Sequence, residues 1–306
     1  MLSSLVLLAT LSADLNAITK GFDGRVGACI QDGQTLNCTR GDERFSLQSV
    51  VKLIVGVAIL DDDRFRTNQP ITIFRKDLSL AVQPIAKLVG PDGYKTTIGD
   101  LIRRTIIDSD SAACDILIAR LGGPKDVNAF LVRKGINGIR VDRDERHLQT
   151  ETNGIQWRDE FVDPKVLDAA IKRIPEAKNL AAYKRYQTDP RDTSTPKGMV
   201  EFLTRLASGD LLPPERTAFI LQAMADCATG EDRLKAGTPS TWKLAHKTGT
   251  SGSRKGLTVA TNDVGILTAP GDGRKIAIAV FVADSTASAE ARAAMIAAIA
   301  KAATMN

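Results

Sequence analysis

The chain has 306 residues, of which 43% are hydrophobic and 25% charged, and its formal net charge is +5. This length can bury a sizeable core in one large domain or two, and the composition is ordinary for a soluble globular protein. The mild charge, with no run of five basic residues, gives no support for a nucleic-acid partner, and two histidines without a Cys-x-x-Cys pair argue against a zinc site.

The N-terminal segment is open to two interpretations. The apolar run at residues 5–9 is too short to span a bilayer, but it resembles the end of a secretory signal. No Lys or Arg precedes Lys20, so the basic start of such a signal is missing. Alternatively, the apolar residues form one stripe of a first helix: Leu5, Leu8, Leu15 and Ile18.

A β-hairpin is predicted next. Residues 26–31 and 35–39 have strand character, and Asp32-Gly33 between them is a strong hairpin signal. Cys29 and Cys38 flank this turn, so a disulfide across the hairpin is conceivable, but a two-residue turn at Asp32-Gly33 would not place them directly opposite each other. The other interpretation is that all four cysteines are reduced and mostly buried: Cys29, Cys38, Cys114 and Cys227.

Helices are predicted in the middle of the chain and strands near both ends. Helical spacing and capping signals predict helices starting at Ser49 and Thr97, and over 112–121, 124–135, 196–207 and 214–225. Strands are predicted at 242–245, 258–267 and 275–283, followed by an Ala-rich helix at 288–303. This order predicts a discontinuous α/β domain formed by 1–48 and 193–306, and a mainly helical domain over 49–192.

Four short motifs supply the groups needed to transfer an acyl group to a serine and then hydrolyse it. In chain order they are Ser49-Val-Val-Lys52, Ser109-Asp110-Ser111, Glu145-Arg-His-Leu148 and Lys247-Thr248-Gly249. Ser-x-x-Lys occurs three times, but only Ser49 opens a long apolar helix, where Lys52 lies on the same face as the hydroxyl. First-turn N–H groups suit a developing oxyanion, and burial is expected to lower the pKa of Lys52 towards that of a usable base.

Each motif also has a purely structural interpretation. Ser49 could be a helix cap beside a lysine that reaches to water, and Ser109-Asp110 could cap the next helix. Lys247 could protect an exposed edge strand, and the neighbouring His246 is expected to be structural rather than catalytic. Glu145 lies in a run of charged residues that by composition is a solvated loop.

Taken together and in this order, the four motifs resemble those of the class A serine β-lactamases, in particular the PER and CfxA branch. The resemblance covers nearly the whole chain and includes further matches at 24–27, 41–45, 48–50, 112–115, 191–196, 229–234, 245–252, 262–263 and 279–282. It implies a serine β-lactamase/DD-peptidase-like α+β fold, in which an antiparallel sheet flanked by helices forms a three-layer α/β domain beside an all-helical domain, with the site lying between the domains.

The resemblance also implies roles for individual residues. Ser49 would attack the β-lactam carbonyl, and the N–H groups of Ser49 and Thr250 would form the oxyanion hole. Lys52 and Glu145 would take the serine proton, Glu145 would activate the deacylating water, and Ser109 would pass a proton to the departing nitrogen. The substrate-binding residues would be Ser111, Gln149, Arg233, Lys247, Thr248, Gly249 and Thr250.

Three departures from the family pattern stand out. Ser111 replaces the usual Asn after Ser-Asp, and Gln149 replaces the Asn that helps to hold the deacylating water. The Ω loop, matched by Arg143 to Asp192, is much longer than the resemblance implies. Within it Asp163-Pro164 predicts a helix start. The extra segment is either a surface decoration or a lid that borders the active site.

By this resemblance the protein is a hydrolase that acts on a small-molecule β-lactam. It would be a monomer without metal, cofactor, nucleic-acid partner or membrane span, and it would be secreted or periplasmic. Two alternatives of the same fold are a penicillin-binding DD-peptidase or esterase, and a non-hydrolytic β-lactam-sensing domain. Glu145 argues against the peptidase, which has no need of a deacylating carboxylate.

Overall fold

The computed structural model describes residues 15–80 and 82–305. It divides into two compact units, of which the first comprises Met1–Val50, Lys134–Arg140 and Asp192–Asn306, and the second comprises Val51–Arg133 and Val141–Arg191. The boundaries predicted at 48/49 and 192/193 lie close to these. The prediction wrongly assigned residues 134–140 to the helical domain, because the short strand within them pairs with Thr193 and Ser194 of the first unit.

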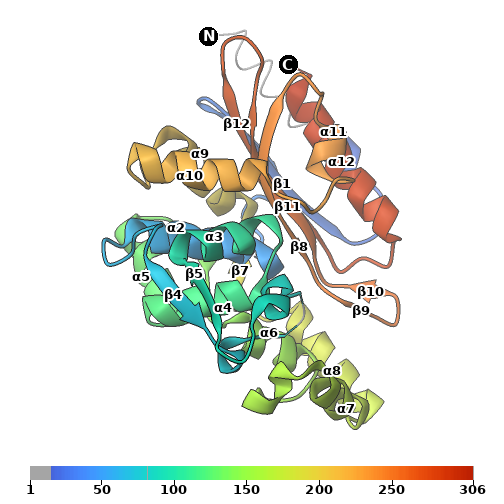
Figure 1. Cartoon of the computed structure of the whole chain (residues 1–306). Helices are drawn as coiled ribbons and strands as arrows, with labels where there is room; N and C mark the ends of the chain where they lie inside the picture. The colour runs from blue at the N-terminus through green and yellow to red at the C-terminus, as the bar shows by residue number, and fades with distance from the viewer. Residues whose placement is uncertain (1–14, 81, 306) are drawn as a thin grey trace. The chain divides into compact units, whose positions relative to one another are not determined.

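The first unit contains a five-stranded antiparallel sheet with the strand order β2-β1-β12-β11-β8. Helix α12 (Ala289–Thr304) packs on one face of the sheet beside α11 (Leu234–Gly237), while α9 (Pro196–Ser208) and α10 (Pro214–Ala225) contact its strands from the other side (Figure 1). The strands are β1 (Arg25–Asp32), β2 (Thr35–Thr39), β8 (Lys243–Thr250), β11 (Thr261–Thr268) and β12 (Lys275–Ala283).

Both faces of this sheet are covered, which explains why the residues of its central strands β11 and β12 are buried almost without interruption. On the α12 face, alternate residues of β12 such as Ile276, Ile278 and Val280 join one core with Ile296 and Ile299 of α12. The start of the described chain also contributes, because residues 15–19 are helical and Leu15 is fully buried in the same core. The predictions for residues 1–14 lie outside the described residues.

The hairpin register differs from the one that Asp32-Gly33 predicted. Asp32 pairs with Thr35, so the two-residue loop is Gly33-Gln34, and Gly33 has a positive φ of 53°, as a primed turn requires at its first central position. This shift by one residue places Cys29 directly opposite Cys38, and the two form a disulfide with an S–S distance of 2.00 Å. The prediction that they would not be opposite, and the interpretation of four reduced thiols, were therefore wrong.

Three short strands and a small hairpin complete the first unit. The strands β3 (Phe45–Ser46), β7 (Thr193–Ser194) and β6 (Ile139–Arg140) form a sheet in the order β3-β7-β6. The hairpin consists of β9 (Ser253–Arg254) and β10 (Leu257–Thr258). Because β3 ends three residues before Ser49, this small sheet holds the chain that leads to the predicted nucleophile.

The second unit is mainly helical, with one two-stranded sheet formed by β4 (Pro70–Ile73) and β5 (Tyr94–Thr97). The predicted capping at Thr97 is confirmed, because its hydroxyl accepts the N–H of Asp100 at 3.2 Å. Helix α2 is apolar except for Lys52 and the terminal Asp61, and it is buried from Val51 to Leu60. Its helices before the Ω loop are α2 (Val51–Asp61), α3 (Ile98–Ile107), α4 (Ser111–Leu121) and α5 (Pro124–Arg133), with 3-10 turns at Arg75–Asp77 and Pro84–Leu88.

The enlarged Ω loop is helical, as predicted. It contains α6 (Glu145–Thr152), a 3-10 turn (Asp159–Val162), α7 (Pro164–Lys172) and α8 (Glu176–Gln187). Asp163 caps α7 by accepting the N–H of Lys165 at 2.9 Å, and Pro164 occupies its first turn. No residue of α7 is buried, whereas Tyr183 and Tyr186 of α8 are. The lid interpretation of this segment stays a prediction.

None of the helices in the described part of the chain is long and apolar enough to span a membrane. Within residues 15–80 and 82–305 no group of three or more His, Cys, Asp and Glu side chains is arranged to hold a metal ion.

Candidate active site

The predicted site residues fall into two groups, one in each unit. The first unit holds Ser49 and the residues of the Lys247-Thr248-Gly249 motif, together with Arg233. The second unit holds Lys52, Ser109, Ser111, Glu145 and Gln149. The chain passes directly from the 3-10 turn that contains Ser49 (Gln48–Val50) into α2, which carries Lys52.

The turn that carries Ser49 is fixed by backbone hydrogen bonds and by one buried amide. Leu47 donates its N–H to the carbonyl of Asp192 at 2.9 Å, and Gln48 has a positive φ of 47°. The Nδ2 of Asn262 in β11 donates to the carbonyls of Ser46 at 2.8 Å and Leu47 at 3.1 Å. Asn262 is 1% exposed, so these bonds are shielded from water and hold the chain before Ser49 in one conformation.

Gly249 lies against the Ser49 turn. A Cβ atom at this position would come within 2.6 Å of the Leu47 carbonyl oxygen and 3.2 Å of the Ser49 amide nitrogen. The φ of Gly249 is not positive, so space rather than backbone conformation requires glycine here. The end of β8 therefore approaches the backbone of the Ser49 turn so closely that no Cβ atom fits between them.

The remaining residues of the motif present a lysine and hydroxyl groups along β8. Lys247 is fully buried, and its Nζ donates to the carbonyl of Thr248 at 3.1 Å. Thr248 shares a hydroxyl–hydroxyl hydrogen bond of 2.6 Å with Thr229. Arg233 donates to the Thr250 hydroxyl at 2.7 Å and to the Asn262 carbonyl at 2.9 Å. The predicted extra guanidinium is thus held at the end of β8.

His246 forms a buried ion pair with Asp263. Its Nδ1 lies 2.9 Å from one carboxylate oxygen of Asp263 and 3.1 Å from the other, and both side chains are at most 3% exposed. Burial alone would lower the pKa of His246, but the Asp263 carboxylate and Cys227 override it and raise the pKa to about 10. In turn, burial would raise the pKa of Cys227, but the cationic His246 lowers it to about 7.

In the second unit, four polar groups lie close to the ammonium of Lys52. Its Nζ lies 2.7 Å from the Ser109 carbonyl, 3.4 Å from the Ser109 hydroxyl and 3.1 Å from the Ser111 hydroxyl. The same Nζ lies 3.3 Å from Oε1 of Glu145, and the two side chains are 1% and 3% exposed. Three of the predicted motifs therefore meet at one buried lysine.

The Ser109-Asp110 motif has both a capping residue and a hydroxyl that faces Lys52. Asp110 caps α4 by accepting the N–H of Ala113 at 2.9 Å, and it also accepts the N–H of Ile85 at 2.7 Å. Ser109 has a positive φ of 58°, a conformation that a serine rarely adopts. Because Asp110 satisfies the helix end, the Ser109 hydroxyl is left to face Lys52.

Glu145 is buried, which excludes its interpretation as part of a solvated loop. Asp144 caps α6 by accepting the N–H of His147 at 2.9 Å, so the helix begins at Glu145. Gln149, one turn further, donates from Nε2 to Oε2 of Glu145 at 3.4 Å. The two residues expected to handle the deacylating water therefore lie side by side on α6.

The sequence interpretation gave no role to Asp115, which positions Glu145. Asp115 lies one turn after Ser111 on α4 and accepts the N–H groups of Glu145 at 2.7 Å and Arg146 at 3.2 Å. The Ser79 hydroxyl donates to the same carboxylate at 2.6 Å. Burial, Asp144 and Glu145 raise the pKa of Asp115 to about 8. A carboxylate within an otherwise apolar helix was the signal that could have found it.

Comparison with known proteins shows which family the chain belongs to. The family model described as "Beta-lactamase enzyme family" matches residues 10–306. The β-lactamase VEB-1 of Pseudomonas aeruginosa is 29% identical over 298 residues, which cover 95% of this chain and 88% of that protein. The extended-spectrum β-lactamase PER-1 of the same organism, which belongs to the branch named above, is 29% identical over 85% of this chain and 74% of its own length.

Solved structures of β-lactamases are also similar to this chain. A β-lactamase from Chitinophaga pinensis DSM 2588 has a TM-score of 0.78 and 27% identity, covering 96% of this chain and 97% of that one. An ancestral class A β-lactamase (GNCA) has a TM-score of 0.76 and 30% identity, covering 95% and 98%. The predicted fold class is therefore confirmed, and the chain belongs to the β-lactamase enzyme family as a class A serine β-lactamase.

Proposed function

We propose that this β-lactamase opens the β-lactam amide through an acyl-enzyme on Ser49 and releases the product with the help of Glu145. The observation that carries the proposal is the buried ammonium of Lys52, which lies within hydrogen-bond distance of the hydroxyls of Ser109 and Ser111 and 3.3 Å from Glu145. A lysine, a carboxylate and two hydroxyls in contact can pass protons among themselves, and acyl transfer to a serine requires such transfers.

In the first step the Ser49 hydroxyl oxygen bonds to the β-lactam carbonyl carbon. Its proton goes to Lys52 or Glu145, directly or through water, and the N–H groups of Ser49 and Thr250 stabilise the oxyanion. The carbon–nitrogen bond of the ring then breaks, and Ser109 passes a proton to the leaving nitrogen. The close fit of Gly249 against the Ser49 amide supports this assignment, since an oxyanion donor must be held rigidly.

In the second step water attacks the Ser49 ester. Glu145 takes the proton of the water, and the Ser49 oxygen leaves with a proton, which restores the free enzyme. Gln149 supports the same water in the place of the family's Asn, and its Nε2 contact of 3.4 Å with Glu145 is consistent with that role.

The substrate carboxylate is assigned to the end of β8. Lys247, Thr248 and Thr250 supply a cation and two hydroxyls, and Arg233 adds a guanidinium that already bonds the Thr250 hydroxyl at 2.7 Å. Ser111 and Gly249 complete the binding residues. We further propose that the enzyme works as a monomer outside the cytoplasm, which the Cys29–Cys38 disulfide supports because such bonds persist in oxidising compartments.

The test is nitrocefin hydrolysis combined with intact-protein mass spectrometry. Ser49→Ala is expected to abolish both hydrolysis and the covalent adduct. Glu145→Gln is expected to lower kcat by about 10²–10⁴ and to accumulate a Ser49 adduct, because deacylation loses its base whereas Lys52 remains to take the Ser49 proton in acylation. Glu160→Gln, on an exposed side chain of the same loop, is the matched control and should behave as wild type. Wild-type turnover in Glu145→Gln would refute the deacylation role.

A further inference from the structure

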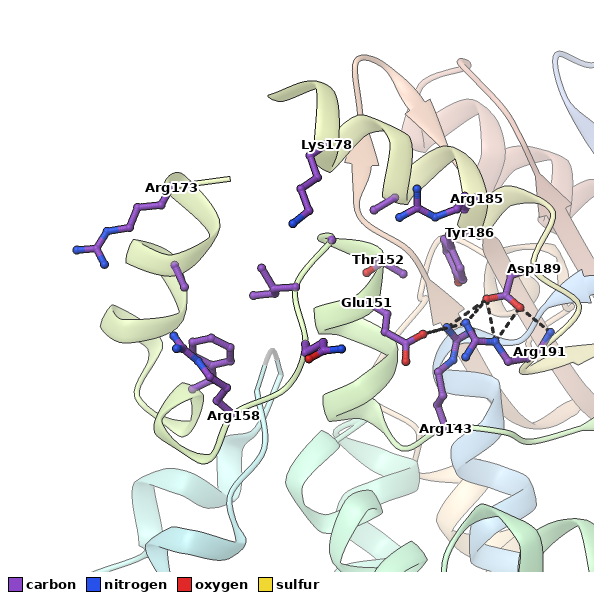
Figure 2. Close-up of a pocket in the computed structure, with 16 residues that line it drawn as sticks. Arg143, Glu151, Thr152, Arg158, Arg173, Lys178, Arg185, Tyr186, Asp189 and Arg191 are labelled. Atoms are coloured by element: carbon purple, nitrogen blue, oxygen red, sulfur yellow. Dashed lines mark hydrogen bonds and ion pairs between the residues drawn. The ribbon is translucent and has the colours of Figure 1, made fainter. Parts of the chain in front are cut away.

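The enlarged Ω loop encloses a pocket that the proposed reaction does not use. It has a volume of about 720 Å³ and is formed by the end of α6, the 3-10 turn at Asp159–Val162, α7 and α8 (Figure 2). This volume lies within the range that binds small molecules in other proteins. All of its lining residues belong to the second unit.

The lining of this pocket is strongly basic. Two of its cations, Arg143 and Arg191, are neutralised within the wall by Glu151 and Asp189, with distances of 2.7 to 3.2 Å (Figure 2). These two carboxylates are the acidic residues among the lining residues, whereas four more cations line the pocket: Arg158, Arg173, Lys178 and Arg185.

Lys178 and Arg185 are the best-placed cations. They lie seven residues apart on α8 and so project from one face of the helix, on the side where Tyr186 also lies (Figure 2). Neither takes part in an ion pair within residues 15–80 and 82–305. Arg158 pairs with Glu160 at 2.9 Å, and Figure 2 shows Arg173 pointing away from the other labelled side chains.

The inner wall of the pocket is apolar. Phe161, Ala182 and Tyr186 are 2%, 3% and 4% exposed, and Ile155 and Ala170 line the same space. Helix α7 reaches it through Ala170 and buries none of its own residues, so its inner side has no complete protein cover. An apolar wall beside two cations without ion-pair partners is complementary to a molecule with an apolar body and an anionic group.

We propose that this pocket binds a small amphipathic anion, with an aromatic or aliphatic body against Phe161, Ala182 and Tyr186 and a carboxylate, sulfonate or phosphate at Lys178 and Arg185. The proposal is independent of the catalytic roles assigned above, because none of these residues belongs to the proposed reaction.

The test is isothermal titration of the folded enzyme with 8-anilinonaphthalene-1-sulfonate, an aromatic sulfonate. The double variant Lys178→Gln/Arg185→Gln is expected to weaken binding by about tenfold, which corresponds to about 1.4 kcal/mol for two partly solvated charge contacts. The matched control is Lys172→Gln/Lys184→Gln, which removes the same charge from α7 and α8 at exposed positions that do not line the pocket.

Two further measurements separate this pocket from general binding. Ala170→Phe fills the pocket without changing its charge and is expected to weaken binding as well. N-phenyl-1-naphthylamine has the same aromatic body without the sulfonate, and its affinity should not respond to Lys178→Gln/Arg185→Gln. Nitrocefin hydrolysis verifies that each variant is folded. Equal sulfonate affinity in the two double variants, or no effect of Ala170→Phe, would overturn the proposal.

Discussion

At the scale of single residues, the space around Gly249 has the clearest consequence. The end of β8 and the Ser49 turn approach each other so closely that one methyl group cannot fit between them. The Ser49 amide is one of the two proposed oxyanion donors. Its position therefore depends on the lack of a side chain at Gly249 in β8.

We expect Gly249→Ala to lower kcat for nitrocefin by about 10²–10³, because displacing the Ser49 turn removes a fixed oxyanion donor. The matched control is Gly252→Ala, since a Cβ atom at Gly252 meets nothing within 4 Å and its φ is not positive. Circular dichroism should show both variants folded. If Gly249→Ala turned over nitrocefin as fast as Gly252→Ala, the close approach would have no catalytic meaning.

Glu145 shows what the sequence could not reveal at this scale. Its neighbours Asp142, Arg143, Asp144 and Arg146 make the run look solvated. The carboxylate is nevertheless 3% exposed, because Asp115 of another helix accepts its backbone N–H and Lys52 faces its side chain. Thirty residues separate Asp115 from Glu145, so only the folded chain shows that they meet.

At the scale of elements, the sequence predicted nearly every long helix and strand, because their periodicity and caps are local. The errors occurred where tertiary contacts decide. The Asp32-Gly33 signal predicted the correct hairpin with the wrong register, since sheet pairing with β12 fixes β1 as far as Asp32. Ser49 was expected to open an α-helix, but it lies in a 3-10 turn that Asn262 holds from β11.

The corrected register makes a disulfide prediction. We expect Cys29→Ala/Cys38→Ala to lower the free energy of unfolding by about 2–3 kcal/mol, because the cross-link restricts the unfolded chain. The free energy of unfolding is measured by urea titration with circular dichroism as the signal. Nitrocefin turnover at 25 °C should not change. Cys114→Ala is the control for the loss of a buried sulfur, since Cys114 is a free thiol. Four titratable thiols in the unreduced, denatured protein would contradict the disulfide.

At the scale of the whole molecule, the chain crosses four times between the two units. The sequence indicated the two outer crossings, because strand patterns occur near both ends of the chain and predicted a helical insertion between Ser49 and Asp192. It could not indicate the excursion at 134–140, since a strand of two residues has no readable period. Global stability therefore depends on both units, and the buried His246–Asp263 pair links that stability to pH.

The pKa of His246 is raised to about 10 in the folded protein, whereas its ordinary value is 6.5. The stability that comes from this shift is fully present below about pH 6.5 and is lost as the pH rises through 10. In a Cys227→Ala background, which removes the opposite contribution of the lowered Cys227 pKa between about pH 7 and 9, we expect the free energy of unfolding to fall over this window, and to fall less steeply when His246→Gln is added. His147→Gln in the same background changes the other histidine, which is exposed, and should keep the slope of Cys227→Ala. If the free energy of unfolding depended on pH equally in the two variants, His246 would not be the source of the pH dependence.

The ion pairs of Glu151 with Arg143 and Arg191 fasten the beginning of the enlarged loop to its end. These ion pairs therefore join the two ends of the stretch between residues 153 and 188. Since the entropic cost of loop closure rises by only about 0.6 kcal/mol for each doubling of length, residues inserted at an exposed point of this stretch are expected to cost little stability. An insert whose own ends lie close together would then leave the ion pairs of Glu151 intact, and nitrocefin turnover would measure whether the active site is preserved.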